Sequence, residues 1–142
     1  MRVVLDTDVM LAAFLSPQGA SRLWLSAALR QENQMLISVP LVLEYEAVLT
    51  RPEHLRRAGA SIAEAQLLLD AIVRMGREVA ISYLWRPTLR DPDDEMVLET
   101  AVNGGAAWIV TFNIGDYAGA ERFGINVGQP GPAWRHIKGK QS

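Results

Sequence analysis

The chain opens on the short run Arg2-Val3-Val4-Leu5-Asp6, which is apolar in its middle and ends in an acid. A run this brief and this dense in β-branched residues is typical of a strand that is buried on both faces. Such strands form parallel sheets, and in open α/β sheets ligands bind just outside the carboxyl ends of the strands. We therefore expect a parallel sheet with Asp6 at the edge where a ligand would bind.

Strand-like and helix-like segments alternate along the rest of the chain. We expect further strands at residues 35–39, 79–84, 107–111 and 125–127, the last followed by a tail of Pro and Gly. We expect helices at 9–14, 20–30, 40–49 and 92–103, and one that starts at the capping-box spacing Ser61-Ile62-Ala63-Glu64 and runs toward Met75. Pro52 closes the 40–49 helix. The alternation predicts an α/β fold in which helices cover both faces of a parallel sheet.

The composition limits both the size of the fold and the kind of metal that it could hold. With 142 residues, of which 49% are apolar and 21% charged, we expect one domain spanning 1–142. The chain has no Cys and only two His, which excludes thiolate and His-rich metal sites. Any metal must be held by oxygen, which favours hard cations such as Mg²⁺ or Mn²⁺. The net charge of −2 does not exclude a local basic rim that binds nucleic acid.

Apolar runs in this chain are short. None approaches the roughly 20 residues that a membrane-spanning helix needs. The N-terminus also lacks the basic start and long apolar stretch of a signal peptide. We therefore expect a protein of the cytoplasm with no membrane contact.

Several acids follow expected strands or begin expected helices, and each has a structural explanation as well as a functional one. Asp6 could be a helix N-cap or a metal ligand, and Asp8 could be the cap instead. Helix capping and the helix dipole account for Asp91, Asp93 and Glu95. Asp94 differs, because it shares a helix face with Val97, Leu98 and Ala101 and so needs a partner such as a metal.

Two further positions complete the set of candidate acids. Glu44 and Glu46 lie on opposite borders of an apolar helix sector centred near Tyr45, and helical geometry alone does not choose between them. Asp116 follows the 107–111 strand, where it could be a metal ligand or a turn residue beside Gly115. Acids that converge on one edge repel one another unless a divalent cation neutralises them. The acids alone therefore predict a metal site.

Four segments in this order resemble the PIN domains, especially the toxin components of toxin–antitoxin systems that are related to VapC-type ribonucleases. These segments are 4–9, 44–52, 91–95 with Ala101, and 110–113, and the resemblance extends over most of the chain. It implies a parallel-sheet PIN fold with a Mg²⁺ or Mn²⁺ site made by Asp6, Glu44 and Asp94, and it selects Glu44 over Glu46. It also implies endonucleolytic hydrolysis of RNA by a metal-activated water, which leaves a 5′-phosphate.

The resemblance also implies partners and substrate contacts. Many PIN domains carry a fourth acid where this chain has Asn113, and Asp116 lies close enough in sequence to substitute for it. The candidates for substrate contact are Thr111, Asn113 and Arg51, although a strand Thr is equally often a packing residue and a basic residue at a helix end is often a cap. An antitoxin protein, an RNA substrate and a homodimer are the expected partners.

Two other functions fit part of the sequence. The run Val4-Leu5-Asp6-Thr7-Asp8 also resembles the haloacid dehalogenase phosphatases, in which Asp6 would be the nucleophile and Asp8 the acid/base. Met10 departs from that signature, and the 91–95 cluster precedes the Thr111 strand instead of following it. The other alternative is a non-catalytic PIN-like module that binds a partner protein, which Asn113 favours.

Overall fold

The structure is a computed structural model that describes the backbone of residues 1–81 and 92–141 and the side chains of residues 1–81 and 95–139. Its strands are β1 (Arg2–Leu5), β2 (Gln34–Ile37), β3 (Arg77–Glu78), β4 (Trp108–Val110) and β5 (Asn126–Gly128). They form one sheet in the order β3-β2-β1-β4-β5, and every neighbouring pair is parallel. The predicted parallel sheet is therefore confirmed.

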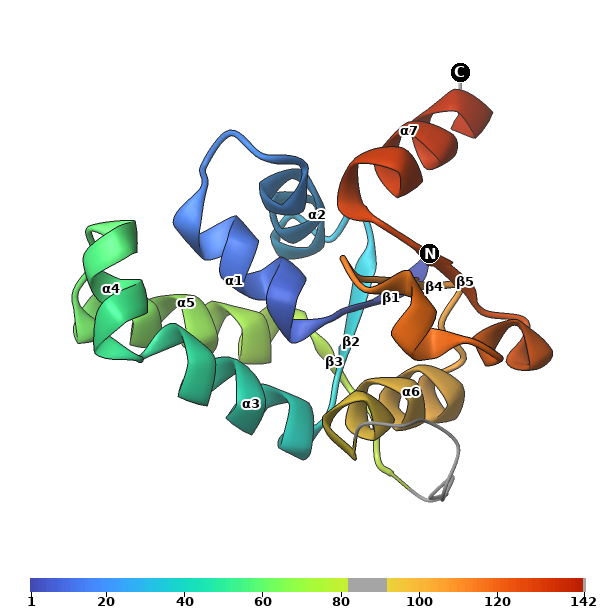
Figure 1. The fold of residues 1–142 in the computed structure, drawn as a ribbon, viewed down its shortest axis with the longest axis horizontal. Helices are drawn as coiled ribbons and strands as arrows, with labels where there is room; N and C mark the ends of the chain where they lie inside the picture. Colours follow the sequence, from blue (N-terminus) through green and yellow to red (C-terminus); the bar gives the residue numbers. More distant parts are fainter. Residues whose placement is uncertain (82–91, 142) are drawn as a thin grey trace.

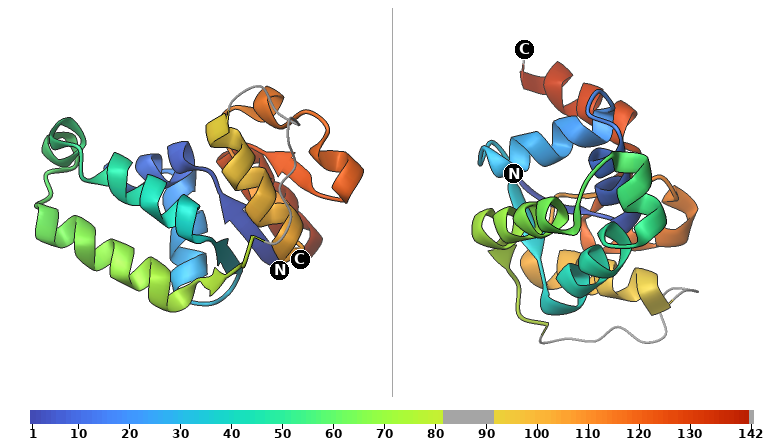
Figure 2. Two further views of the ribbon diagram at one scale, coloured as in Figure 1. Left: turned by 90° about the horizontal axis from the view of Figure 1, so that it is seen from below. Right: turned by 90° about the vertical axis from the view of Figure 1, so that its left-hand side faces the viewer.

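The helices are α1 (Thr7–Leu15), α2 (Ala20–Leu29), α3 (Val39–Leu49), α4 (Pro52–Ala58), α5 (Ile62–Met75), α6 (Pro92–Gly104) and α7 (Pro130–Gln141). Two 3₁₀ helices, η1 (Ile114–Tyr117) and η2 (Ala120–Phe123), connect β4 to β5. The sheet lies between α6 on one side and α2 with α7 on the other (Figures 1 and 2). Helices cover both faces, as the alternation of segments predicts. Among the described residues, no helix combines the length and the apolar character of a membrane span.

The central strand β1 fixes where a ligand site can form. Val3, Val4 and Leu5 are fully buried, which explains why this run is apolar at successive positions. The chain builds β2 and β3 on one side of β1 and then crosses to build β4 and β5 on the other. The strand order therefore reverses between β1 and β4, and the crevice at their carboxyl ends is the expected binding position of an open α/β sheet.

Local sequence signals account for several helix ends. The Ser61 hydroxyl accepts from the Glu64 N–H at 3.1 Å, and the Glu64 carboxylate accepts from the Ser61 N–H at 3.0 Å. This reciprocal pair is the predicted capping box, and it starts α5. Asp6 is the N-cap of α1, and Pro40 lies in the first turn of α3.

Three elements differ from the sequence-based prediction. Pro52 begins α4 as well as following α3, in keeping with the preference of Pro for the first turn of a helix. The expected Pro and Gly tail is the helix α7, held by a hydrogen bond from Trp24 Nε1 to the Pro130 carbonyl at 2.8 Å. Strand β3 occupies 77–78 instead of 79–84, although the Val79 N–H continues the ladder to Ile37 at 2.7 Å. Residues 82–84 lie outside the described part of the chain.

Candidate functional site

Asp6 lies directly after β1, with only 8% of its surface exposed. Its Oδ1 accepts from the Thr7 N–H at 2.7 Å, which is the N-cap contact. Its Oδ2 accepts from the hydroxyls of Thr111, at 2.8 Å, and Tyr117, at 3.0 Å. The two explanations of Asp6 are therefore compatible, because one oxygen caps α1 while the other faces the crevice between β1 and β4.

The electrostatics of Asp6 reflect its burial. Loss of hydration raises its pKa, and the negative charge of Asp116 adds to this rise. The hydrogen bonds from Thr111, Tyr117 and Thr7 act in the opposite direction, because they stabilise the ionised form. Burial outweighs them, so the pKa of Asp6 stays above its usual value. A neighbouring cation would reverse this balance.

The segment after β4 brings Thr111 and Asn113 to the same edge. Thr111 is fully buried, and its hydroxyl donates to Asp6 while accepting from the Asn113 N–H at 3.0 Å. The Asn113 side-chain amide donates to Asp8 Oδ2 at 3.0 Å. Thr111 is thus more than a packing residue, because it orients an acid.

Asp8 belongs to this acidic edge, although sequence reasoning considered it only as a helix cap or as the acid/base of a phosphatase. Burial and then the charge of Asp6 raise the pKa of Asp8 to about 6. Its Oδ1 is buried and, within the described part of the chain, has no hydrogen-bond partner. The Asp-x-Asp spacing at the start of a helix was the sequence signal for it, since Asp6 is the N-cap of α1 and Asp8 lies in its first turn.

Asp116 sits on η1 and is exposed. Its negative charge raises the pKa of both Asp6 and Asp8, which places it on their side of the molecule. Tyr117, the next residue, is buried against Asp6. Sequence reasoning missed Tyr117, because nothing local distinguishes a buried Tyr that bonds an acid from one that only packs.

Glu44 and Glu46 lie on either side of Tyr45 in α3. Tyr45 is fully buried, and its hydroxyl donates to the Leu5 carbonyl next to Asp6. Burial and the charge of Asp6 raise the Tyr45 pKa. Glu46 is exposed and accepts from Gln66 of α5 at 3.5 Å, so it is engaged away from β1. Glu44 is half-buried on the other border of α3.

Asp94 lies in the first turn of α6, but its side chain is outside the described part of the chain, as is all of Asp91. Among the side chains that the structure describes, no group of three or more acids or His is close enough to hold one metal ion. A metal site of three acids at this edge therefore needs at least one acid from outside the described side chains. The donor chemistry fits a hard cation, since the acids supply oxygen only and the imidazole of His54 is buried against the Val48 carbonyl at 2.6 Å.

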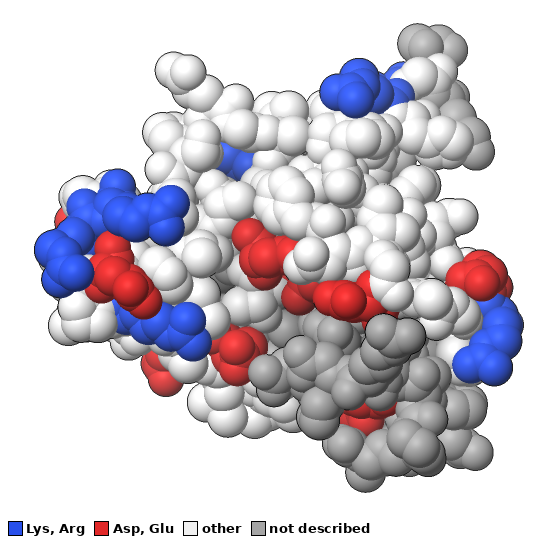
Figure 3. Space-filling view, viewed as in Figure 1, with Lys and Arg blue, Asp and Glu red and all other residues white. Residues whose placement is uncertain are grey.

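Acidic side chains gather in the middle of one face of the molecule, and basic side chains gather over α4 at one end of that face (Figure 3). Arg56 and Arg57 lie in the last turn of α4, and Arg51 is its N-cap. All three are exposed. Arg51 is thus exposed on α4, while the acids occupy the middle of the face.

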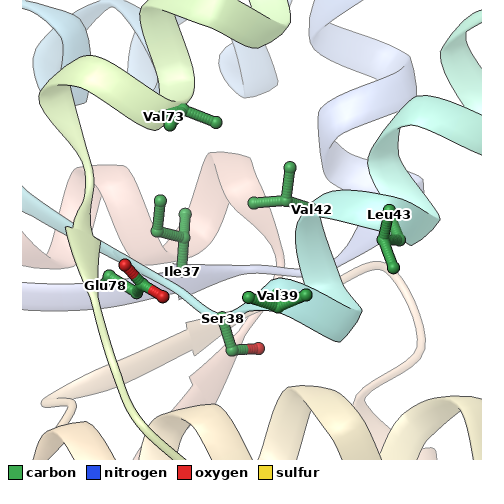
Figure 4. Close-up of a pocket in the computed structure, with 7 residues that line it drawn as sticks. All are labelled: Ile37, Ser38, Val39, Val42, Leu43, Val73 and Glu78. Atoms are coloured by element: carbon green, nitrogen blue, oxygen red, sulfur yellow. The ribbon is translucent and has the colours of Figure 1, made fainter.

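A separate cavity of about 240 Å³ lies beside the first turns of α3 (Figure 4). Its lining is apolar apart from Ser38 and Glu78, and consists of Ile37, Ser38, Val39, Val42, Leu43, Val73 and Glu78. Val39, Leu43 and Val73 are each more than half exposed, at 60%, 59% and 53%. This cavity has one carboxylate and no acid cluster, so it is distinct from the acidic edge.

Comparison with known proteins agrees with the fold and the order of the motifs. The profile of the family described as PIN domain matches residues 2–115, a range that includes Asp6, Glu44 and Asp94 but ends one residue before Asp116. A crystal structure of VapBC2 from Rickettsia felis, bound to a DNA fragment from their promoter, is similar with a TM-score of 0.60 and 16% identity. The similarity covers 89% of this chain and 97% of that chain. Curated protein sequences gave no match.

Proposed function

Because this chain belongs to the PIN-domain family, we propose that it is a metal-dependent endoribonuclease that hydrolyses RNA phosphodiester bonds. The observation that carries the proposal is that Asp6 and Asp8 lie beside the carboxyl ends of β1 and β4, held there by hydrogen bonds from Thr111 and Asn113. Burial and the charges of Asp6 and Asp116 make ionisation of Asp8 costly. A protein keeps such a cluster where a cation neutralises it. The family match also favours this function over the phosphatase alternative.

The proposed ligands of a Mg²⁺ or Mn²⁺ ion are Asp6, Glu44 and Asp94, with Asp116 as the fourth acid. A bound divalent cation supplies positive charge against the phosphodiester and lowers the pKa of water. Thr111 and Tyr117 hold Oδ2 of Asp6 in one orientation and favour its ionised form. Without a cation, the acidic edge repels RNA phosphates, so we expect the metal to be needed for substrate binding as well as for hydrolysis.

The remaining contacts with RNA are proposed for the segments around the acids. Positive charge for the phosphates of RNA that extends beyond the acids comes from α4, through Arg51, Arg56 and Arg57. Asn113 is a further candidate, because its side chain is at the edge with Asp8.

We also propose that the protein is the toxin of a toxin–antitoxin pair in the cytoplasm and forms a homodimer. Support comes from the similarity in fold to one chain of the VapBC2 complex. The similarity covers 97% of that chain. The apolar cavity of α3 supplies a surface for a protein partner, since Val39, Leu43 and Val73 expose large apolar area around it.

The experiment that tests the nuclease measures RNA cleavage with Mg²⁺, with Mn²⁺ and with EDTA. We expect cleavage with either metal, none with EDTA, and a loss of at least about 100-fold in Asp6→Asn and Glu44→Gln. Glu46→Gln is the matched control, because this neighbouring acid is exposed and faces α5. Cleavage that persists in EDTA, or in Asp6→Asn, would refute the proposal.

The second candidate is a non-catalytic module that binds a partner protein, and Asn113 at the position of the fourth acid favours it. Titration calorimetry with Mn²⁺ separates the two functions. A nuclease of the proposed kind binds Mn²⁺ and loses this binding in Asp94→Asn. A module whose acids serve only as helix caps binds no Mn²⁺, or binds it equally well in that variant.

A further inference from the structure

Asn113 occupies the position where an acid is expected, yet the structure brings a carboxylate to its side. The Asn113 side-chain amide donates to Asp8 Oδ2 at 3.0 Å, and the Phe112 N–H donates to the same oxygen at 3.2 Å. Residues 8 and 113 are 105 positions apart in the chain, so this contact exists only in the folded protein. It fixes one oxygen of Asp8 against the segment that follows β4.

The second oxygen of Asp8 has no such partner. Oδ1 is buried and has no hydrogen-bond partner within hydrogen-bonding geometry in the described part of the chain. Besides Phe112 and Asn113, only the Val9 backbone N–H stabilises the ionised carboxylate among the described residues. A buried acceptor without a partner costs free energy, so native structures rarely keep one unless another group satisfies it. Among the described residues, the charges that act on Asp8 are those of Asp6 and Asp116, both negative. The partner that suits Oδ1 in these surroundings is a cation.

We propose that Asp8 supplies the carboxylate that position 113 lacks and is a further ligand of the divalent cation, with Asn113 as its positioning residue. The amide of Asn113 holds Oδ2 and leaves Oδ1 available. The carboxylate that the segment after β4 lacks at position 113 is thus supplied from the start of α1, in addition to the four acids proposed above. This assignment rests on the proposed function, from which it takes the cation.

A purely structural role for Asp8 makes a different prediction. An Asn at position 8 keeps an oxygen that can accept from Phe112 and Asn113, so it preserves the loop contact while it removes the charge. If Asp8 only anchored the loop, Asp8→Asn would therefore bind metal like the wild type. If Asp8 is a ligand, the lost charge weakens metal binding although the loop contact remains.

The test uses Mn²⁺ titration calorimetry and thermal denaturation with and without Mn²⁺ on the full chain. We expect Asp8→Asn to bind Mn²⁺ at least about 10-fold more weakly while its metal-free Tm is equal to or above that of the wild type. The exchange variant Asp8→Asn/Asn113→Asp, which returns the acid to position 113, should recover affinity to within about threefold. Asn113→Asp alone should lower the metal-free Tm, because it sets two carboxylates side by side, and Mn²⁺ should restore it.

Two results would overturn the assignment. The first is wild-type Mn²⁺ affinity in Asp8→Asn. The second is a weakened affinity that the exchange variant fails to recover, because that outcome indicates a disturbed loop. Asp6→Asn, measured in parallel, separates this failure from failure of the proposed function: Mn²⁺ binding that is lost in Asp6→Asn and kept in Asp8→Asn refutes only the role of Asp8. A wild type that binds Mn²⁺ through Asp8 but cleaves no RNA refutes only the nuclease.

Discussion

The hydroxyl of Thr111 is the best single probe of the acidic edge, because its two hydrogen bonds join Asp6 to the segment after β4. It donates to Asp6 Oδ2 at 2.8 Å, accepts from the Asn113 N–H at 3.0 Å and is fully buried. Thr111→Val keeps the shape of the side chain and removes both contacts. The substitution leaves a buried carboxylate with one donor fewer and a backbone N–H without its acceptor.

The expected cost follows from these two contacts. A hydrogen bond to a charged group contributes about 1.5–3 kcal/mol, and a backbone N–H that loses its acceptor costs about 1 kcal/mol more. We therefore expect Thr111→Val to lower the free energy of unfolding by about 3 kcal/mol at pH 8, which corresponds to a fall in Tm of roughly 10 °C for a domain of this size. Thr111→Ser keeps the hydroxyl and should lose only about 1 kcal/mol for the missing methyl group.

The dependence on pH distinguishes an effect on Asp6 from an effect on packing. The Thr111 hydroxyl lowers the pKa of Asp6, so its removal raises that pKa further above its usual value. A raised carboxyl pKa costs stability where the group is ionised in the folded protein, so the loss should be larger at pH 8 than at pH 5. Urea denaturation of Thr111→Val and Thr111→Ser at pH 5 and at pH 8 measures this loss of unfolding free energy. An equal loss at pH 5 and pH 8, or a loss below about 0.5 kcal/mol, would refute this account of Thr111.

Three other substitutions and conditions test the rest of the fold. Because the Asp8 pKa is raised to about 6, ionisation of Asp8 opposes folding of the metal-free protein. Its free energy of unfolding should therefore fall by about 1 kcal/mol, after solvent screening, as pH rises from about 4 to about 6, and Asp8→Asn should flatten this part of the pH curve in urea denaturation. Trp24→Phe removes the hydrogen bond to Pro130 and should cost about 1–2 kcal/mol, with faster hydrogen exchange in α7 than in β1; uniform exchange rates would contradict it. Gly104→Ala places a Cβ 2.6 Å from Cδ1 of the fully buried Leu36. It should lower the free energy of unfolding, measured in urea, by about 1–3 kcal/mol; wild-type stability would show that the neighbouring side chains adjust without cost.

The parts of the fold that could be predicted from sequence are those decided by short-range chemistry. The β-branched run before Asp6 has few alternatives to a buried strand, and the Ser61–Glu64 spacing specifies its capping box. The C-terminal helix could not be predicted, because Pro130, Gly131 and Pro132 are poor signals for a helix. It depends on Trp24, which bonds Pro130 and meets Trp134 edge to face at 5.3 Å. Tertiary packing overrides local propensity there.

In the candidate site, too, the sequence could select some residues, whereas others depend on contacts between distant segments. Asp6 could be selected because strand ends are where α/β sheets bind ligands. The structure adds that one of its oxygens caps α1 while the other accepts from Thr111. The roles of Asp8 and Tyr117 could not be selected, since both depend on contacts between segments more than 100 positions apart. Asp6, Glu44, Asp94 and Asp116 all remain predictions as metal ligands.

Because β4 pairs with β1, the acidic edge can form only late in synthesis of the chain. The first 110 residues contain Asp6, Asp8 and Glu44 but neither Thr111 nor Tyr117, whose hydroxyls orient Asp6. In a nascent chain of that length, neither hydroxyl is present to hold Oδ2 of Asp6. The edge is assembled only when β4 pairs with β1 and η1 closes over it. A chain interrupted before that point therefore carries the acids without the arrangement that we propose makes them a metal site.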